Sequence, residues 1–189
     1  MSPRPRLLLI AVLVAACATP AVTSFDPSGP CTQDGSAPGA YPELEAMVPT
    51  SYEATPPRTL DSGRNCSTEA LGVLRQAGIN EARFAGGTWT FGGNRAAALV
   101  VFRAPGLTAD AMADFYTESA RAANRTRVTA ESTPTLAGRA VHRIDTMTGS
   151  RQQTVVVWPA AATDVVNVVI TNDLPDPKIE SAVAAFAGR

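Results

Sequence analysis

The fold of this chain is decided by the stretch "EARFAGGTWTFGGNRAAALVVFRAPG", residues 81–106. Two extended runs flank Gly92-Gly93-Asn94, and because these residues tolerate positive φ, the pattern predicts a β-hairpin. The second run, 96–102, is apolar on both faces, which predicts a central strand covered from both sides. Gly86-Gly87 in the first run indicates a bulge or a close backbone approach. We therefore expect a sheet with packing on both faces.

Helical patterns flank this hairpin on both sides. Ser67 is a candidate N-cap for a helix over residues 67–78, and Thr108 is one for a second helix over residues 108–123. Apolar residues at helical spacing predict a third helix over residues 175–187, which begins at a proline. Residues 57–63 can supply one strand before the first helix.

Four further strands are predicted after the second helix. The links between them are short, with turns at residues 148–150 and 159–163, and short links favour antiparallel neighbours. The fold class is therefore α+β: residues 41–189 form a single domain, an antiparallel sheet of about five to seven strands with two or three packed helices. The four strands are "RVTAES" (127–132), "GRAVHRIDTM" (138–147), "QQTVVVW" (152–158) and "DVVNVVIT" (164–171).

Composition supports a packed domain and bounds its partners. Of the 189 residues, 45% are hydrophobic and 17% are charged, which is too apolar for intrinsic disorder. The formal net charge is −1. This mildly acidic balance argues against a general nucleic-acid binder.

The N-terminus has the organisation of a signal peptide over residues 1–16. Arg4 and Arg6 precede an apolar run from Leu7 to Ala16, which ends in small residues suited to a signal peptidase. The run is too short for a membrane span, which needs about 20 apolar residues. We therefore expect this segment to be a targeting signal.

The end of this signal, Val14-Ala15-Ala16-Cys17, resembles the lipobox of bacterial lipoproteins, with Val where Leu is commonest. The resemblance covers only the signal and implies that Cys17 is lipid-modified and becomes the first residue of the mature chain. It also implies a protein anchored by lipid to the bacterial cell membrane on its extracytoplasmic side. Ordinary cleavage after Ala18, with Cys17 incidental, is the alternative.

Residues 17–40 are predicted to be a lipidated tether, because Pro, Gly, Ser and Thr dominate there without hydrophobic periodicity. The other two cysteines, Cys31 and Cys66, form an even pair in a compartment where disulfides persist, so we expect them to bond. Two free thiols or a metal pair are the alternatives. A metal site is disfavoured because the chain has one histidine and no clustered ligands.

Catalytic patterns are weak. His142, with Asp145 and Ser150 nearby, invites comparison with a catalytic triad, but positions 142 and 145 of one strand point in opposite directions, and no G-x-S-x-G turn supports a nucleophile. The acid pairs are typical of solvated helix faces, and the glycine pairs lack the lysine of a phosphate loop. The acid pairs are Asp110 with Asp114 and Glu43 with Glu45.

Arginines and aromatic residues recur on the predicted strands. Solvated strand faces explain the arginines adequately, and the alternative is one Arg-rich sheet edge or face that contacts an anionic envelope polymer or lipid headgroups. The aromatic residues are expected mainly to fill the core and pair across the sheet. The arginines are Arg83, Arg95, Arg103, Arg139, Arg143 and Arg151; the aromatic residues are Trp89, Phe91, Phe102 and Tyr116.

The sequence thus favours a lipid-anchored extracytoplasmic module that binds an envelope protein, polymer or lipid, without catalytic residues, cofactor or metal. One alternative is a carrier of a lipid or small apolar ligand, motivated by the doubly apolar runs 96–102 and 164–170. It requires a large apolar cavity between the sheet and the helices. The other alternative is a hydrolase on an unrecognised scaffold, which requires acids or His142 to converge in one cleft.

Overall fold

The predicted hairpin forms the middle of the sheet. A computed structural model describes residues 25–187, so the predicted signal peptide and Cys17 lie outside the described residues. Strands β3 (Ala82–Thr90) and β4 (Ala96–Arg103) pair antiparallel along their whole length. Gly92 and Gly93 take φ angles of 79° and 60° in the connecting turn, as the hairpin pattern predicts.

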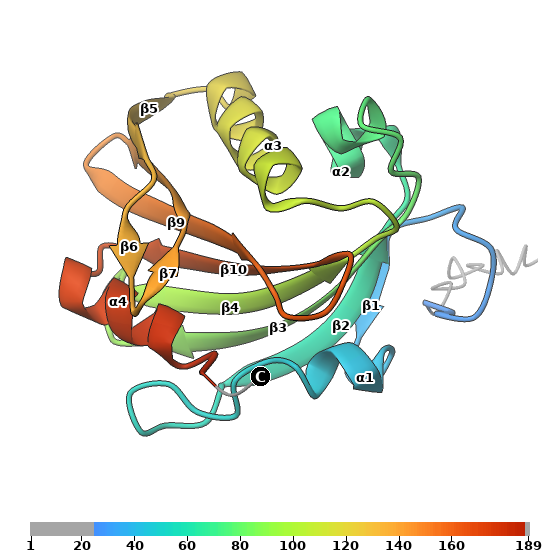
Figure 1. Ribbon diagram of the computed structural model, residues 1–189, viewed down its shortest axis with the longest axis horizontal. Helices are drawn as coiled ribbons and strands as arrows, with labels where there is room; N and C mark the ends of the chain where they lie inside the picture. Colours follow the sequence, from blue (N-terminus) through green and yellow to red (C-terminus); the bar gives the residue numbers. More distant parts are fainter. Residues whose placement is uncertain (1–24, 188–189) are drawn as a thin grey trace, which may run out of the picture.

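The main sheet has eight strands, and every neighbouring pair is antiparallel (Figure 1). Its strand order is β1-β2-β3-β4-β10-β9-β8-β5, and β6 and β7 form a separate two-stranded ribbon. The remaining bounds are β1 (Gly35–Ala37), β2 (Thr59–Asn65), β5 (Thr126–Ser132), β6 (Thr135–Leu136), β7 (Arg139–Ala140), β8 (His142–Thr148), β9 (Arg151–Pro159) and β10 (Val165–Asn172).

The main sheet has one strand more than the five to seven expected, and the ribbon of β6 and β7 adds two. Strand β1 lies in the segment expected to be tether, where no alternating pattern announces it. The single strand expected over residues 138–147 is divided at Val141, so that its first part pairs in the ribbon and its second part joins the main sheet.

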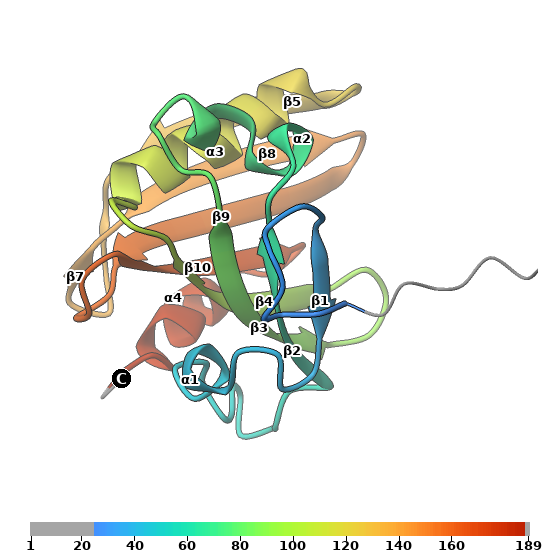
Figure 2. The ribbon, with the colours of Figure 1, turned by 90° about the vertical axis from the view of Figure 1, so that its right-hand side faces the viewer.

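Helices cover both faces of the sheet, which Figures 1 and 2 show from two directions. On one face lie α1 (Pro42–Glu45) and α4 (Asp176–Ala184); on the other lie α2 (Thr68–Leu71), the 3-10 helix η1 (Gly72–Arg75) and α3 (Ala109–Ala122). The helix expected over 67–78 is broken because Gly72 ends α2 with a φ of 49°. The helix expected over 108–123 is confirmed, with the Thr108 side chain as its N-cap.

Strand β4 shows how one run of apolar residues supplies two cores. Leu99 and Val101 pack in the cluster beneath α1 and α4, whereas Val100 and Phe102 pack in the cluster beneath α3. All four side chains are buried, and β4 is fourth of the eight strands. The expectation of a central strand covered on both sides is therefore confirmed.

The glycine pair of β3 does not form the bulge that was one of its two interpretations. The β2–β3 register continues unbroken through Gly86 and Gly87. A Cβ atom on Gly87 would lie 2.8 Å from the ring of Trp89 and 3.1 Å from Pro57. The absence of a side chain at Gly87 therefore lets Trp89 and Pro57 pack directly against the backbone of β3.

Candidate functional site

The predicted disulfide is formed. Cys31 and Cys66 are bonded with their Cα atoms 5.5 Å apart, and the bond ties the N-terminal segment to the end of β2. The Asp34 carboxylate reinforces this junction, because it accepts hydrogen bonds from the backbone N–H groups of Cys66 and Ser67 and from the Ser67 hydroxyl. Since the chain has three cysteines, this pairing leaves Cys17 outside the bond.

Arg64, in β2, holds the segment that precedes the disulfide. Its side chain is 4% exposed, and its guanidinium donates hydrogen bonds to the carbonyl oxygens of Asp26, Gly29 and Pro30 at 2.7–3.1 Å. The same guanidinium lies 5.6 Å from the ring centre of Phe25. Residues 25–37, which the sequence indicated to be part of a linker, are thus packed against the domain from Phe25 onward.

Three arginines lie side by side on the α1 face of the sheet. Arg64 is the register partner of Arg83 in β3, and Arg83 is the partner of Arg103 in β4. Neighbouring strands are about 4.8 Å apart, so the three side chains start in one row. Like charges directly opposite each other destabilise a sheet, so this row needs compensation.

Glu81 supplies part of that compensation. Its Oε1 atom lies 2.8 Å from Nε of Arg83 and 4.0 Å from Nη1 of Arg64. The hydrogen bond that Arg83 donates to Glu81 raises the pKa of Arg83, which stays a cation. The Arg83 guanidinium also lies 4.9 Å from the ring centre of Tyr41, and the Tyr41 hydroxyl donates to the carbonyl oxygen of Pro27.

Arg103 differs from these two arginines, because no carboxylate of the described residues pairs with it. Its side chain is exposed, and within residues 25–187 its guanidinium forms no hydrogen bond or ion pair. The terminal nitrogens of Arg83 likewise make no hydrogen bond within the described part of the chain, since only its Nε is engaged by Glu81. Several guanidinium donors therefore face outward together.

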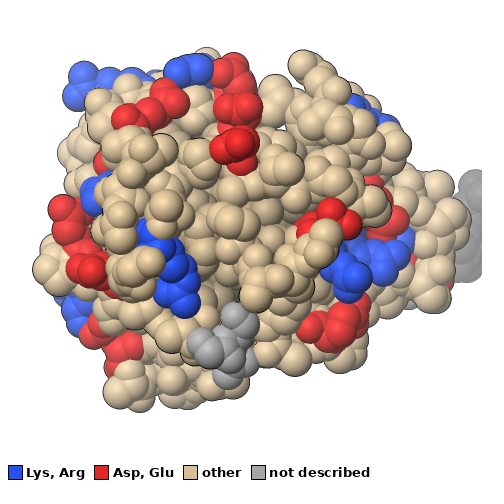
Figure 3. All heavy atoms as spheres, in the orientation of Figure 1, with Lys and Arg blue, Asp and Glu red and all other residues tan. Residues whose placement is uncertain are grey.

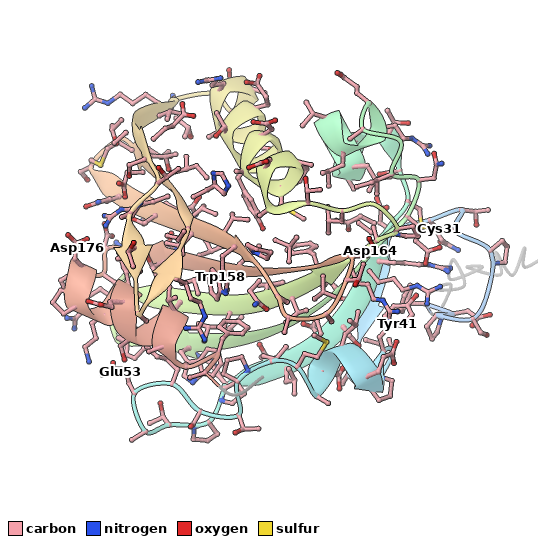
Figure 4. All side chains as sticks on the ribbon, in the orientation of Figure 1. Cys31, Tyr41, Glu53, Trp158, Asp164 and Asp176 are labelled. Carbon is pink, nitrogen blue, oxygen red and sulfur yellow. A yellow bond between two sulfur atoms is a disulfide. The ribbon has the colours of Figure 1, made fainter. Side chains whose placement is uncertain are left out.

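These donors border a surface hollow of about 520 Å³, which we call the arginine hollow. Figure 3 shows basic and acidic side chains gathered at this end of the molecule, and Figure 4 shows Tyr41 at the same end as Cys31. The hollow can accept an oxyanion beside two arginines, in a setting where two glutamates limit the net positive charge. Its lining is Glu43, Gly78, Ile79, Asn80, Glu81, Arg83, Arg103, Ala104 and Pro105.

The other arginines singled out in the sequence do not join this site. Arg143 binds Asp145 and Asp176 on the α4 face, near the opposite end of the molecule. Arg95 donates to a carbonyl oxygen within the hairpin turn. The basic surface expected from the sequence is therefore limited to Arg83 and Arg103, and Arg64, which no sequence pattern marked, lies beside them.

One sequence signal could have joined Arg83 to Arg103. A hairpin turn centred on Gly93 pairs residues at equal distances before and after it, and Arg83 and Arg103 are each ten positions away. No comparable signal connects Arg64, because a helical segment separates β2 from β3.

His142 lies far from a triad arrangement. Its Nε2 atom is 2.9 Å from the Asp110 carboxylate, at the first turn of α3. Asp145 instead binds Arg143 and Thr154 on the opposite face of the sheet, as the alternation of strand side chains predicts. The hydroxyl of Thr108, which lines the hollow that contains His142, is engaged as the N-cap of α3.

The acid pairs are placed individually by the fold. Glu45, expected on a solvated helix face, accepts hydrogen bonds from the Ser62 hydroxyl and the Gly39 N–H. Glu43 is exposed at the arginine hollow, and Asp114 is exposed on α3. Within residues 25–187, no group of three or more histidine, cysteine or acidic side chains is placed to hold a metal ion.

Comparison with known proteins assigns the chain to no family. No protein-family model matches the chain, and no curated protein is significantly similar to it. Among the helices of the described residues, none has the length and apolar character needed to cross a membrane.

Proposed function

We propose that this protein is a lipid-anchored, extracytoplasmic binding module of a bacterial cell membrane, without enzymatic activity. The observation that carries the proposal is the Cys31–Cys66 bond. Structural disulfides persist outside the cytosol, in the compartment to which the signal peptide directs the chain. The bond also engages the two other cysteines, so Cys17 is available for the lipid that its lipobox-like context implies.

The packing of residues 25–37 holds the domain close to its anchor. Eight residue steps separate Cys17 from Phe25. Whatever conformation they adopt, they extend at most about 28 Å, because one residue spans at most about 3.5 Å. The end of the domain that carries Arg64 and the disulfide therefore stays within about 28 Å of the lipid-modified cysteine in the anchored protein.

The packed cores on both faces of the sheet favour binding at the surface over carriage of an apolar ligand. The doubly apolar strands that motivated a carrier, β4 and β10, contribute side chains to both buried clusters. The hollows at the surface of the described residues, of about 340–650 Å³, have mixed polar and apolar linings. Ligand extraction followed by lipid analysis tests this choice, and a stoichiometric lipid recovered from the Cys17→Ser chain would favour the carrier.

A hydrolase has weaker support. His142 and Asp110 form one pair beside α3, and Asp164 lines the same hollow. The Asp164 carboxylate, however, accepts a hydrogen bond from the backbone N–H of Gly106, which gives it a loop-fixing role. A binding function has stronger support, because two arginines with unpaired hydrogen-bond donors line the arginine hollow.

The intact mass of the native chain tests the anchored state. The chain is extracted with detergent from bacterial membranes and weighed with and without reduction. We expect a product that starts at Cys17 with added acyl mass, and a gain of two hydrogens on reduction. The Cys17→Ser chain should lack the acyl mass and leave the membrane fraction. An unacylated wild-type product would refute the anchoring.

A further inference from the structure

We infer that the arginine hollow binds the phosphodiester group of a phospholipid in the membrane that holds the protein. This inference rests on the proposed anchoring, which brings the hollow to the bilayer surface. It adds a ligand class and a binding site, with Arg103 and Arg83 as the residues that touch the ligand.

The free donors define the chemistry. A guanidinium presents N–H donors in a planar fork that matches two oxygens of a phosphate, and such charge-assisted hydrogen bonds are about twice as strong as neutral ones. Arg103 has no partner for its guanidinium within residues 25–187, and Arg83 has its terminal nitrogens free. Their Cα atoms are direct register partners, so the two forks can address one oxyanion.

The surrounding charges select a singly charged group. Arg64, Arg83 and Arg103 bring three positive charges, and Glu43 and Glu81 bring two negative charges to the same end of the sheet. A net charge of about +1 suits a phosphodiester, which carries one negative charge. A dianionic phosphate monoester would be repelled more strongly by the two carboxylates at these short distances.

The position of the hollow selects the membrane as the source. Tyr41, over which Arg83 lies, donates a hydrogen bond to Pro27, and Arg64 lies beside Phe25, the first described residue. Two strand spacings, about 10 Å, separate Arg64 from Arg103. Figure 2, which looks toward the β1 edge of the sheet, shows the chain that leads into β1 lying beside the sheet. The hollow thus lies next to the point where the anchored chain enters the domain.

The test uses the purified mature lipoprotein in neutral detergent micelles. The side-chain N–H signals of its arginines are followed by NMR during titration with dimethyl phosphate, acetate or inorganic phosphate. Two soluble short-chain lipids, dihexanoyl phosphatidylglycerol and dihexanoyl phosphatidylcholine, are titrated in parallel. We expect saturable shifts of the Arg83 and Arg103 signals with dimethyl phosphate and with both lipids, and weaker binding of acetate and inorganic phosphate.

Arg103→Gln is the decisive variant, because the exposed Arg103 guanidinium forms no hydrogen bond or ion pair within residues 25–187. We expect it to weaken the binding of dimethyl phosphate and of both lipids about tenfold, the effect of removing one charged hydrogen-bond partner. Arg127→Gln is the matched control, since Arg127 is exposed on β5 at the opposite edge of the sheet. It should bind as the wild type does.

Three results would overturn the inference. They are an unchanged affinity in Arg103→Gln, an equal loss in Arg127→Gln, or tighter binding of acetate or inorganic phosphate than of dimethyl phosphate. The titrations report ligand binding at the arginine hollow, whereas the intact mass reports the acylation of Cys17. The two measurements therefore distinguish a failure of the phosphodiester site from a failure of the proposed anchoring.

Discussion

Removing the disulfide should cost this domain a large part of its stability. Cys31 and Cys66 are 35 positions apart, so their bond closes a loop of about 36 residues. In the chain-entropy model such a cross-link restricts the unfolded chain enough to stabilise the fold by about 4 kcal/mol. Domains are commonly stable by about 5–15 kcal/mol in total. We expect the Cys31→Ala/Cys66→Ala double variant to stay folded but to lose about this amount.

Urea unfolding followed by circular dichroism measures the loss. With a dependence of about 2 kcal/mol per molar urea, the unfolding midpoint should fall by about 2 M. Wild-type protein under reducing conditions should unfold at the midpoint of the double variant. A loss below about 1 kcal/mol would refute the argument, because it would mean that the cross-link does not restrict the unfolded chain as the chain-entropy model requires.

Three further changes should each alter the free energy of unfolding. Gly87→Ala should lower the free energy of unfolding by about 1–3 kcal/mol, because its Cβ would lie 2.8 Å from the Trp89 ring. Gly86→Ala is the control: the nearest atom to its Cβ would be 3.2 Å away, so it should cost less in the same urea experiment. The reverse order of the two variants would contradict the packing argument. Thr108→Ala should cost about 1 kcal/mol through loss of the α3 N-cap, and no change in the urea midpoint would exclude that role. Hydrogen bonds from Lys178 and Ser181 lower the pKa of Glu53 below its ordinary 4.5, so the ionised carboxylate favours the folded state. The Glu53→Gln variant should therefore be less stable than the wild type above pH 5. This difference in stability should disappear as the pH falls through the folded-state pKa of Glu53, which lies below 4.5. A difference that persisted at pH 2 would exclude this linkage.

Local signals in the sequence predict the elements that local interactions determine. The turn at Gly92-Gly93 specifies the β3–β4 hairpin, and the Thr108 cap with its apolar stripe specifies α3. The segment 25–37 was indicated to be a linker because its composition lacks periodicity. Its order comes from distant partners, chiefly the Arg64 guanidinium and Cys66, which local patterns do not reveal.

The candidate site divides in the same way. The pairing of Arg83 with Arg103 follows from the hairpin geometry and could be predicted by counting outward from Gly93. The alignment of Arg64 with them depends on the register of β2 against β3, whose connection includes helices. The hollow itself depends on Glu43, which α1 brings to the rim. Sequence reasoning can thus identify the two arginines but not the site that they line.

Arg103 is the residue at which stability and binding make opposite demands. Opposed like charges across two strands typically cost a few tenths of a kcal/mol to about 1 kcal/mol, and Glu81 offsets the charges of Arg83 and Arg64 but does not touch Arg103. If Arg103 served the fold, Arg103→Gln would lower the free energy of unfolding. We expect it to be unchanged or to rise by up to about 1 kcal/mol, while the affinity for dimethyl phosphate falls. A stability loss above about 1 kcal/mol would make Arg103 a structural residue, and the case for a built anion site would then lose its central cation.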